Sequence, residues 1–262
     1  MLSLNEFFSL LDKHAPIKYS KKYIELGDYD NSGILVKSSD KVSKVLFSLD
    51  LSLSVIKRAK ALKVDTIVTH HPAIYSPLKS ISDSGEGGDI FNAIKNGFNV
   101  ISMHLNLDVA DGGIDDVLVK GLGGEKYKIL FPILEGVGYG REFKTKEITF
   151  SEFVKNAKKE FNTTRVVCYG SKSAKIKTGA SFCGSGSSYV EKYLIGGGNA
   201  DVIVSSDMPH HVIKGIIESG KCVLILTHYS AENKGLYAYY EKIKKEIEKE
   251  VECYYFSDKR FL

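Results

Sequence analysis

The stretch Thr66-Ile67-Val68-Thr69-His70-His71-Pro72 contains the two patterns that decide the fold and the site of this chain. An unbroken run of apolar and β-branched residues is typical of a strand buried on both faces, as in a parallel sheet. Two histidines follow this run directly, and Pro72 marks the break in the strand. Further runs of the same kind lie at residues 45–49, 100–103, 202–205 and 223–226.

Helical patterns lie between these runs, for example at residues 54–62 and 89–96. Near the N-terminus, Ser3 and Glu6 have the spacing of a capping box, which predicts an opening helix over residues 3–14. Strand, helix and strand in this order predict βαβ units. We therefore expect an α/β fold.

The length of 262 residues allows two small domains or one large one. The stretch 121–135 is rich in loop-forming residues and is the expected boundary. We expect two α/β lobes with mostly parallel or mixed sheets. Residues 1–126 would form the lobe with the His-His-Pro motif, and residues 127–262 the lobe with a His-x-x-x-Glu motif, with the two lobes interlaced.

The composition is that of an ordinary globular protein, with 43% apolar and 26% charged residues. It excludes disordered and collagen-like chains. A net charge of +4 is too mild to favour nucleic acid, which selects a concentrated basic face. No apolar run reaches the roughly 18 residues of a membrane helix, and no signal peptide is visible. We expect a cytoplasmic protein whose four cysteines are reduced.

Potential ligands follow each buried run. They are His70 and His71, His104 and Asp108, His228 and Glu232, Asp207 with His210 and His211, and Asp50. Composition alone predicts about 0.16 adjacent histidine pairs, whereas the sequence has two. In open α/β sheets, sites lie outside the carboxyl ends of the strands. These side chains are therefore expected to converge there, between the lobes.

Imidazole and carboxylate groups in one place are typical ligands of Zn, Fe, Mn, Co or Ni. The i,i+4 spacing of His228 and Glu232 lets both side chains point one way if a helix begins there. His104 and Asp108 have the same spacing but are expected in a polar loop. Adjacent histidines that diverge at a strand break would suit two metals, bridged by Asp108 or Glu232.

Other interpretations stay open at this stage. A histidine at a strand end is commonly a hydrogen-bonding residue without a metal. The segment from Asp207 to His211 has either a structural role or a role in orienting ligands. The Gly/Ser loop with Gly184, Ser185 and Gly186 can cradle an anion at a helix N-terminus, or it is a plain turn and helix cap. The loop lacks a Walker lysine and a serine nucleophile elbow.

Several motifs together resemble the Nif-three-like dinuclear-metal family, whose members are often catalogued as GTP cyclohydrolase I type 2 homologues. The motifs are Asp30-Asn31-Ser32-Gly33, Leu49-Asp50-Leu51-Ser52, Thr69-His70-His71-Pro72, His104-Leu105-Asn106-Leu107-Asp108, Asp111-Gly112-Gly113, Gly184-Ser185-Gly186, Asp207-Met208-Pro209-His210-His211 and His228-Tyr229-Ser230-Ala231-Glu232. The resemblance covers almost the whole chain. It implies a compact form without the ferredoxin-like insertion of some relatives, and a homo-oligomer, most often a ring-like hexamer.

The resemblance also implies a site for two divalent transition-metal ions per chain. The ligands would be His70, His71, Asp108, His228 and Glu232, with His104 close to the metals. A metal pair would activate water for hydrolysis of a small, nucleotide-like molecule. His104 or His210 would then serve as acid or base, and the loop at Gly184–Gly186 would hold the anionic part of the substrate. The alternative is a metal-binding or regulatory protein without turnover.

Overall fold

The computed structural model describes residues 1–85 and 87–261, and the chain divides into two compact units. Unit 1 contains Met1–Asp111 and Leu236–Ser257, and unit 2 contains Gly112–Gly235 with the C-terminal residues from Asp258. The chain therefore first passes from unit 1 to unit 2 after Asp111, and not near residue 126. The reason is that β7 (Lys126–Leu134), in the stretch expected to be a linker, is a strand of unit 2 that pairs antiparallel with β8 (Val137–Thr149).

The sheet of unit 1 has five strands in the order β13-β4-β5-β6-β2. Their bounds are β13 Glu252–Phe256, β4 Lys44–Ser48, β5 Thr66–Thr69, β6 Asn99–Ser102 and β2 Gly33–Val36. The first four are parallel to one another, and β2 runs antiparallel to β6. The three apolar runs in this half of the sequence are thus strands of one mainly parallel sheet, as predicted. A small antiparallel pair, β1 (Leu2–Ser3) and β3 (Lys41–Val42), completes the unit.

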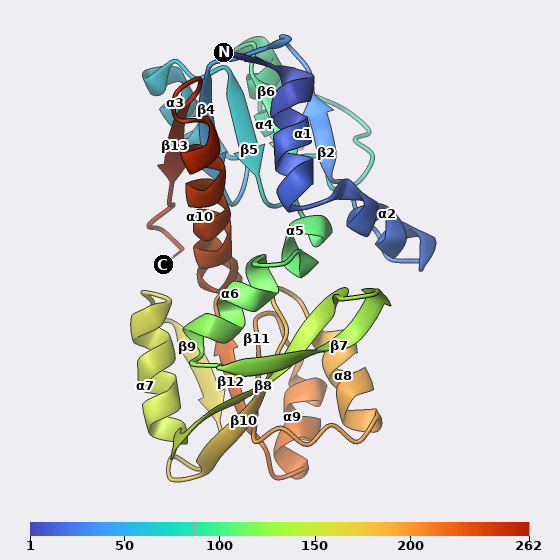
Figure 1. The fold of residues 1–262 in the computed structure, drawn as a ribbon, viewed down its shortest axis with the longest axis vertical. Coiled ribbons are helices and arrows are strands. Elements are labelled where there is room, and N and C mark those ends of the chain that lie inside the picture. Colours follow the sequence, from blue (N-terminus) through green and yellow to red (C-terminus); the bar gives the residue numbers. More distant parts are fainter. Residues whose placement is uncertain (86, 262) are drawn as a thin grey trace. The chain divides into compact units, whose positions relative to one another are not determined.

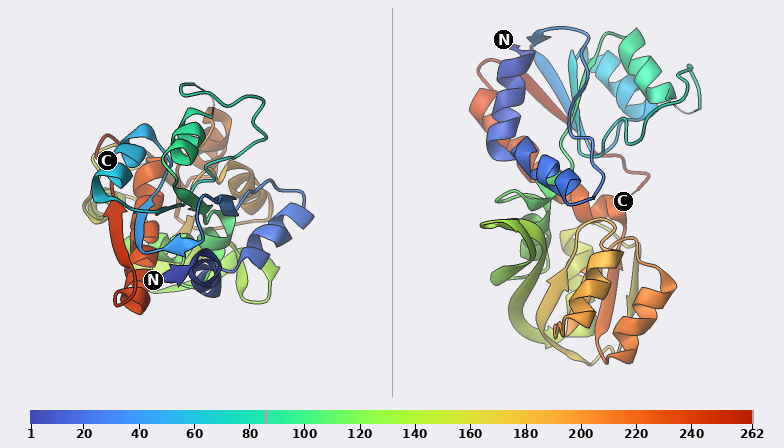
Figure 2. Two further views of the ribbon diagram at one scale, coloured as in Figure 1. Left: turned by 90° about the horizontal axis from the view of Figure 1, so that it is seen from above. Right: turned by 90° about the vertical axis from the view of Figure 1, so that its right-hand side faces the viewer.

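Helices cover both faces of this sheet (Figures 1 and 2). One face carries α3 (Leu53–Leu62) and α4 (Gly88–Lys95), whose apolar residues form one core cluster with Leu46, Ile67 and Val100. The other face carries α1 (Leu4–His14) and the part of α10 (His228–Ile247) from Leu236 onwards. There, the ring of Phe47 lies 5.4 Å from that of Tyr240. Burial on both faces explains why these strands do not alternate polar and apolar residues.

Local signals at the N-terminus are confirmed as well. The hydroxyl of Ser3 accepts a hydrogen bond from the amide of Glu6, and the Glu6 carboxylate accepts one from the amide of Ser3. This reciprocal cap starts α1. A second amphipathic helix, α2 (Ile17–Glu25), follows. None of the helices within residues 1–85 and 87–261 combines the length and apolar character needed to cross a bilayer.

The sheet of unit 2 has six strands in the order β7-β8-β10-β11-β12-β9. The remaining bounds are β10 Lys175–Ser181, β11 Val202–Ser205, β12 Cys222–Leu226 and β9 Val166–Tyr169. The three central strands are parallel to one another, and their neighbours β8 and β9 run antiparallel to them. The edge strand β7 is antiparallel to β8. The crossover helices α8 (Ser187–Ile195) and α9 (His210–Glu218) lie on one face, with α6 (Ile114–Gly121) and α7 (Phe150–Glu160) on the other (Figure 2). Both units are therefore α/β structures.

A buried ionic cluster ties α6 to β8 in unit 2. The guanidinium of Arg141 donates to Asp116 Oδ1 at 2.7 Å and to Asp115 Oδ2 at 3.4 Å. Asp115 also accepts hydrogen bonds from the amides of Gly140 and Cys183. Burial raises the pKa of Asp115 in spite of the neighbouring guanidinium. Such a cluster is stable only while each member has its partners.

We predict that Arg141→Met lowers the free energy of unfolding by about 3–5 kcal/mol, because it leaves two buried carboxylates without their counter-charge. Urea denaturation followed by circular dichroism measures this. The control is Lys177→Met, which removes a cation from an ion pair with Glu147 whose side chains are 65% and 46% exposed. That control should cost less than about 1 kcal/mol. Equal losses in the two variants would contradict the prediction.

Candidate metal centre

His70 and His71 lie side by side because β5 ends just before them. The amides of both residues donate to the carbonyl of Leu49, at 3.1 and 3.0 Å, so the alternation of a regular strand stops at Thr69. Their ring centroids are 4.9 Å apart. The break that Pro72 predicted therefore allows two successive histidines to face the same region.

His104 joins this pair from the end of β6. Its ring centroid lies 5.2 Å from that of His70 and 5.8 Å from that of His71. Asp108 follows on a short helix, α5 (Leu105–Val109), so the polar loop expected here is wrong. Asn106 of this helix is buried, and its side-chain amide donates to the Ala15 carbonyl at 2.6 Å, which anchors the helix to a distant part of the chain. The ring nitrogens of His70, His71 and His104 are close enough to share an ion.

The orientation of His70 indicates which of its nitrogens is available to a metal. Its Nδ1 lies 2.8 Å from the carbonyl oxygen of Met103. A carbonyl only accepts, so Nδ1 carries the proton and Nε2 carries the lone pair. Nε2 faces Asp108 Oδ1 at 3.5 Å, and both side chains are buried. Two electron-pair donors that face each other without water repel, and a cation bound between them would remove this repulsion.

His71 and His104 are held in the same way, by carboxylates. Asp50 Oδ1 lies 2.6 Å from Nδ1 of His71, and Asp30 Oδ1 lies 2.7 Å from Nδ1 of His104. Burial raises the pKa of Asp30, but its hydrogen bonds with His104, Ser20 and Ser32 outweigh this and hold the pKa below the ordinary value. Asp30 is therefore ionised and accepts the Nδ1 proton. A carboxylate on the far nitrogen is the usual support of a metal-binding histidine.

In unit 2, His228 and Glu232 lie on successive turns at the start of α10. The Nδ1 atom of His228 is 2.6 Å from Asp207 Oδ2, and its Nε2 atom is 3.0 Å from Glu232 Oε2. Glu232 is 2% exposed. His228 thus combines two features that unit 1 has on separate histidines: a carboxylate at Nδ1, as at His71 and His104, and a buried carboxylate in front of Nε2, as at His70.

The Gly184 backbone comes very close to these two side chains. Gly184 has a φ of +58°, and a Cβ added there would lie 2.6 Å from Glu232 Oε1 and 3.4 Å from His228 Nε2. Ser185 is exposed, and Gly186 is the N-cap of α8. The structure therefore brings the first residue of the predicted loop to His228 and Glu232, while an anion-binding role for the loop stays a prediction.

The model of the Duf34/NIF3 (NGG1p interacting factor 3) family matches residues 2–260. The chain belongs to this family. A relative named "GTP cyclohydrolase 1 type 2 homolog", from Clostridium perfringens, is 30% identical over 96% of this chain and 95% of its own length. A relative from Saccharomyces cerevisiae, named "NGG1-interacting factor 3", is 29% identical over 87% of this chain and 86% of its own length.

Solved structures share the fold. The Bacillus cereus protein related to NIF3 superposes with a TM-score of 0.86 at 18% identity, covering 98% of this chain and 97% of that one. Reduced HcgD from Methanocaldococcus jannaschii has a TM-score of 0.81 at 28% identity, and the match covers 98% of each chain. The expected family resemblance is therefore confirmed, as is the two-unit α/β fold.

His210 does not share this pattern. It begins α9 and is exposed, and the neighbouring His211 lies 3.5 Å from Glu191. Within the described ranges, no hydrogen bond or ion pair joins His210 to His228 or Glu232. A proton-transfer role for His210 stays a prediction.

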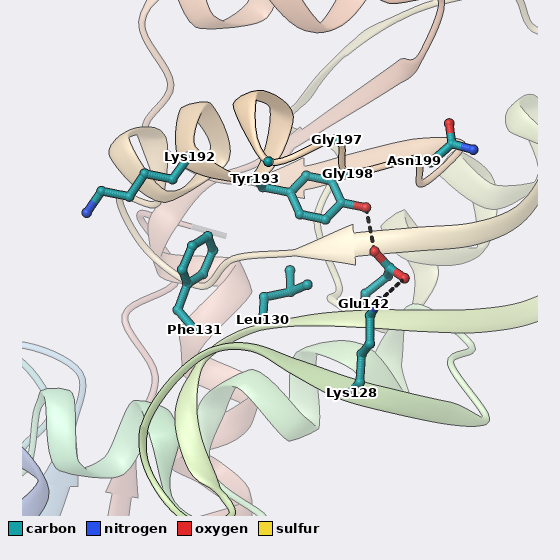
Figure 3. Close-up of a pocket in the computed structure, with 10 residues that line it drawn as sticks. Lys128, Leu130, Phe131, Glu142, Lys192, Tyr193, Gly197, Gly198 and Asn199 are labelled. Atoms are coloured by element: carbon teal, nitrogen blue, oxygen red, sulfur yellow. Dashed lines mark hydrogen bonds and ion pairs between the residues drawn. The ribbon is translucent and has the colours of Figure 1, made fainter.

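A pocket of about 380 Å³ lies elsewhere in unit 2, next to β7, β8 and the end of α8 (Figure 3). Its wall includes a network in which Glu142 accepts from the Tyr193 hydroxyl at 2.7 Å and pairs with Lys128 at 2.9 Å. Burial and this carboxylate raise the pKa of Tyr193. None of the predicted metal ligands lines this pocket, so it is separate from the candidate centre.

Sequence reasoning missed the partner of His104. Asp30 was visible only as part of a family motif, and nothing in its local pattern links it to a residue 74 positions away. Asp50 and Asp207 were noticed as acids at strand ends. The structure shows that they accept hydrogen bonds from His71 and His228.

We predict that Gly184→Ala lowers the metal content of the purified protein, because the new methyl group would displace the Glu232 carboxylate. The matched control is Gly197→Ala. Gly197 also has a positive φ, +79°, but a Cβ there would meet nothing within 4 Å. Both variants should lose about 1–2 kcal/mol of stability through backbone strain. Only Gly184→Ala should lose metal in elemental analysis. Equal metal contents in the two variants would disprove the close approach.

Proposed function

We propose that this chain is a metal-dependent hydrolase of a nucleotide-like small molecule. It would use two divalent transition-metal ions, held by the ligands His70, His71, Asp108, His228 and Glu232. The observation that supports this most strongly is that Nδ1 of each ligand histidine lies on a hydrogen-bond acceptor, so that Nε2 is the nitrogen that would bind an ion. The names of the relatives, which include "GTP cyclohydrolase 1 type 2 homolog", agree with a hydrolytic reaction on a nucleotide.

The donor set fits the proposed ions. Imidazole nitrogens and carboxylate oxygens suit Zn, Fe, Mn, Co and Ni better than Mg or Ca. Asp108 and Glu232 each have two oxygens, so either carboxylate can bridge a pair of ions. When bound, two such ions activate water and stabilise a developing oxyanion.

The protein's own side chains would orient and move protons. Asp50 and Asp207 keep the rings of His71 and His228 from rotating. His104 is the proposed base, since its Nε2 can take a proton while Asp30 at Nδ1 stabilises the resulting positive charge. His210, at the start of α9, is proposed as a second proton donor or acceptor. The backbone at Gly184, Ser185 and Gly186 would hold the anionic part of the substrate.

We predict two ions per chain by elemental analysis after reconstitution with zinc or manganese. Asp108→Ala should lose both ions if it bridges them, whereas His228→Ala should lose mainly one. The control is His211→Ala, whose side chain is 72% exposed, and it should keep both ions. One ion or none in the wild type would contradict the two-metal proposal.

The same preparations allow turnover to be measured. Zinc- or manganese-loaded wild type should hydrolyse a nucleotide such as GTP, and chelation should abolish the reaction. If a fully loaded protein turns over no nucleotide, amide or phosphoester, the function is metal binding or regulation without catalysis.

We also propose that the chain forms a homohexamer, which rests on the family resemblance. Light scattering at micromolar concentration should then give a mass of about 174 kDa, six times the 29.0 kDa chain. A mass of one chain would contradict this.

A further inference from the structure

We propose that Tyr29 and Tyr75 form a binding surface for a planar heteroaromatic ring, directly beside His104. The inference rests on the proposed function for the reacting end of the substrate. It identifies a second part of the substrate, a planar ring, and the two tyrosines that would bind this ring. It can be tested by binding alone.

The two tyrosines form an exposed aromatic pair. Tyr29 is 49% exposed and Tyr75 is 54% exposed. Their ring centroids are 5.1 Å apart with an interplanar angle of 67°, which is an edge-to-face contact. The Tyr75 ring also lies 6.4 Å from the His104 ring, at 85°. A large aromatic surface is therefore held open to solvent next to a residue of the candidate centre.

The segment that carries Tyr29 fixes this arrangement, because each of its next three residues binds a different part of the site. Asp30 accepts the Nδ1 proton of His104. The Asn31 side-chain amide donates to the Ile74 carbonyl at 2.6 Å, which positions the backbone next to Tyr75. The Ser32 hydroxyl donates to Asp30 Oδ2 and accepts from the His104 amide at 3.0 Å. The tyrosine pair and His104 are thus positioned by one short stretch of chain.

Exposed and preoriented aromatic rings favour a flat ligand. A base or other heteroaromatic ring can stack on a tyrosine face and loses little internal freedom when it does so. Removing one such stack typically weakens binding by about 5- to 150-fold. A ring held on Tyr75 would place its neighbouring atoms at His104 and the two histidines beside it.

The experiment is isothermal titration calorimetry with GMP, UMP and nicotinamide mononucleotide, and with ribose 5-phosphate as the ligand without a ring. The proteins are full-length wild type, Tyr75→Ala, Tyr75→Phe and the control Tyr169→Ala, each with and without zinc. Tyr169 is 41% exposed on β9 of unit 2, so its removal deletes a comparable surface tyrosine elsewhere.

At least one mononucleotide should bind wild type more tightly than ribose 5-phosphate does. Tyr75→Ala should weaken that nucleotide about 5- to 150-fold with unchanged zinc content, and Tyr75→Phe and Tyr169→Ala should bind it within about twofold of wild type. The inference is overturned if no mononucleotide exceeds ribose 5-phosphate, or if Tyr75→Ala binds nucleotides like wild type.

These outcomes are distinct from failure of the proposed function. A protein that binds nucleotides through Tyr75 but hydrolyses none would overturn the hydrolase proposal alone. A zinc-loaded protein that hydrolyses a nucleotide independently of Tyr75 would overturn this inference alone.

Discussion

The hydrogen bond at Nδ1 of each histidine is the interaction on which the candidate centre depends. It settles the tautomer, stops the ring from rotating and leaves Nε2 as the electron-pair donor. In unit 1 the acceptors are the Met103 carbonyl, Asp50 and Asp30, and in unit 2 the acceptor is Asp207. Without these acceptors, neither the protonated nitrogen nor the orientation of each ring would be fixed. With them, each unit presents nitrogen and carboxylate donors in fixed positions.

The two sheets supply these positions at the ends of their parallel strands. β5 and β6 deliver His70, His71 and His104, while the segment after β11 delivers Asp207 and the start of α10 delivers His228. A side chain at position 184 would meet the Glu232 carboxylate, which explains the glycine there. The amide of the preceding residue, Cys183, donates to the buried Asp115 of the ionic cluster. One short loop thus contacts both the buried ionic cluster and Glu232.

Sequence patterns predicted the parts of the structure that local physics determines. Continuous β-branched runs gave the central strands, and the Ser3–Glu6 pair gave the start of α1. Contacts between residues that are distant in the sequence could not be predicted. The Asp30–His104 bond, the Tyr29–Tyr75 pair and the Arg141 cluster join segments whose separation in sequence hides their proximity. The helix α5 was missed because its five residues are too few for a helical pattern, and its anchor, the Asn106–Ala15 hydrogen bond, joins distant positions.

The most direct test of the central claim is a crystal structure of the zinc-loaded protein, with zinc located by anomalous scattering. The account predicts zinc at about 2.0–2.1 Å from Nε2 of His70, His71 and His228, with every Nδ1 still on its present acceptor. Zinc bound through Nδ1, or rings turned away from Met103, Asp50 and Asp207, would contradict it.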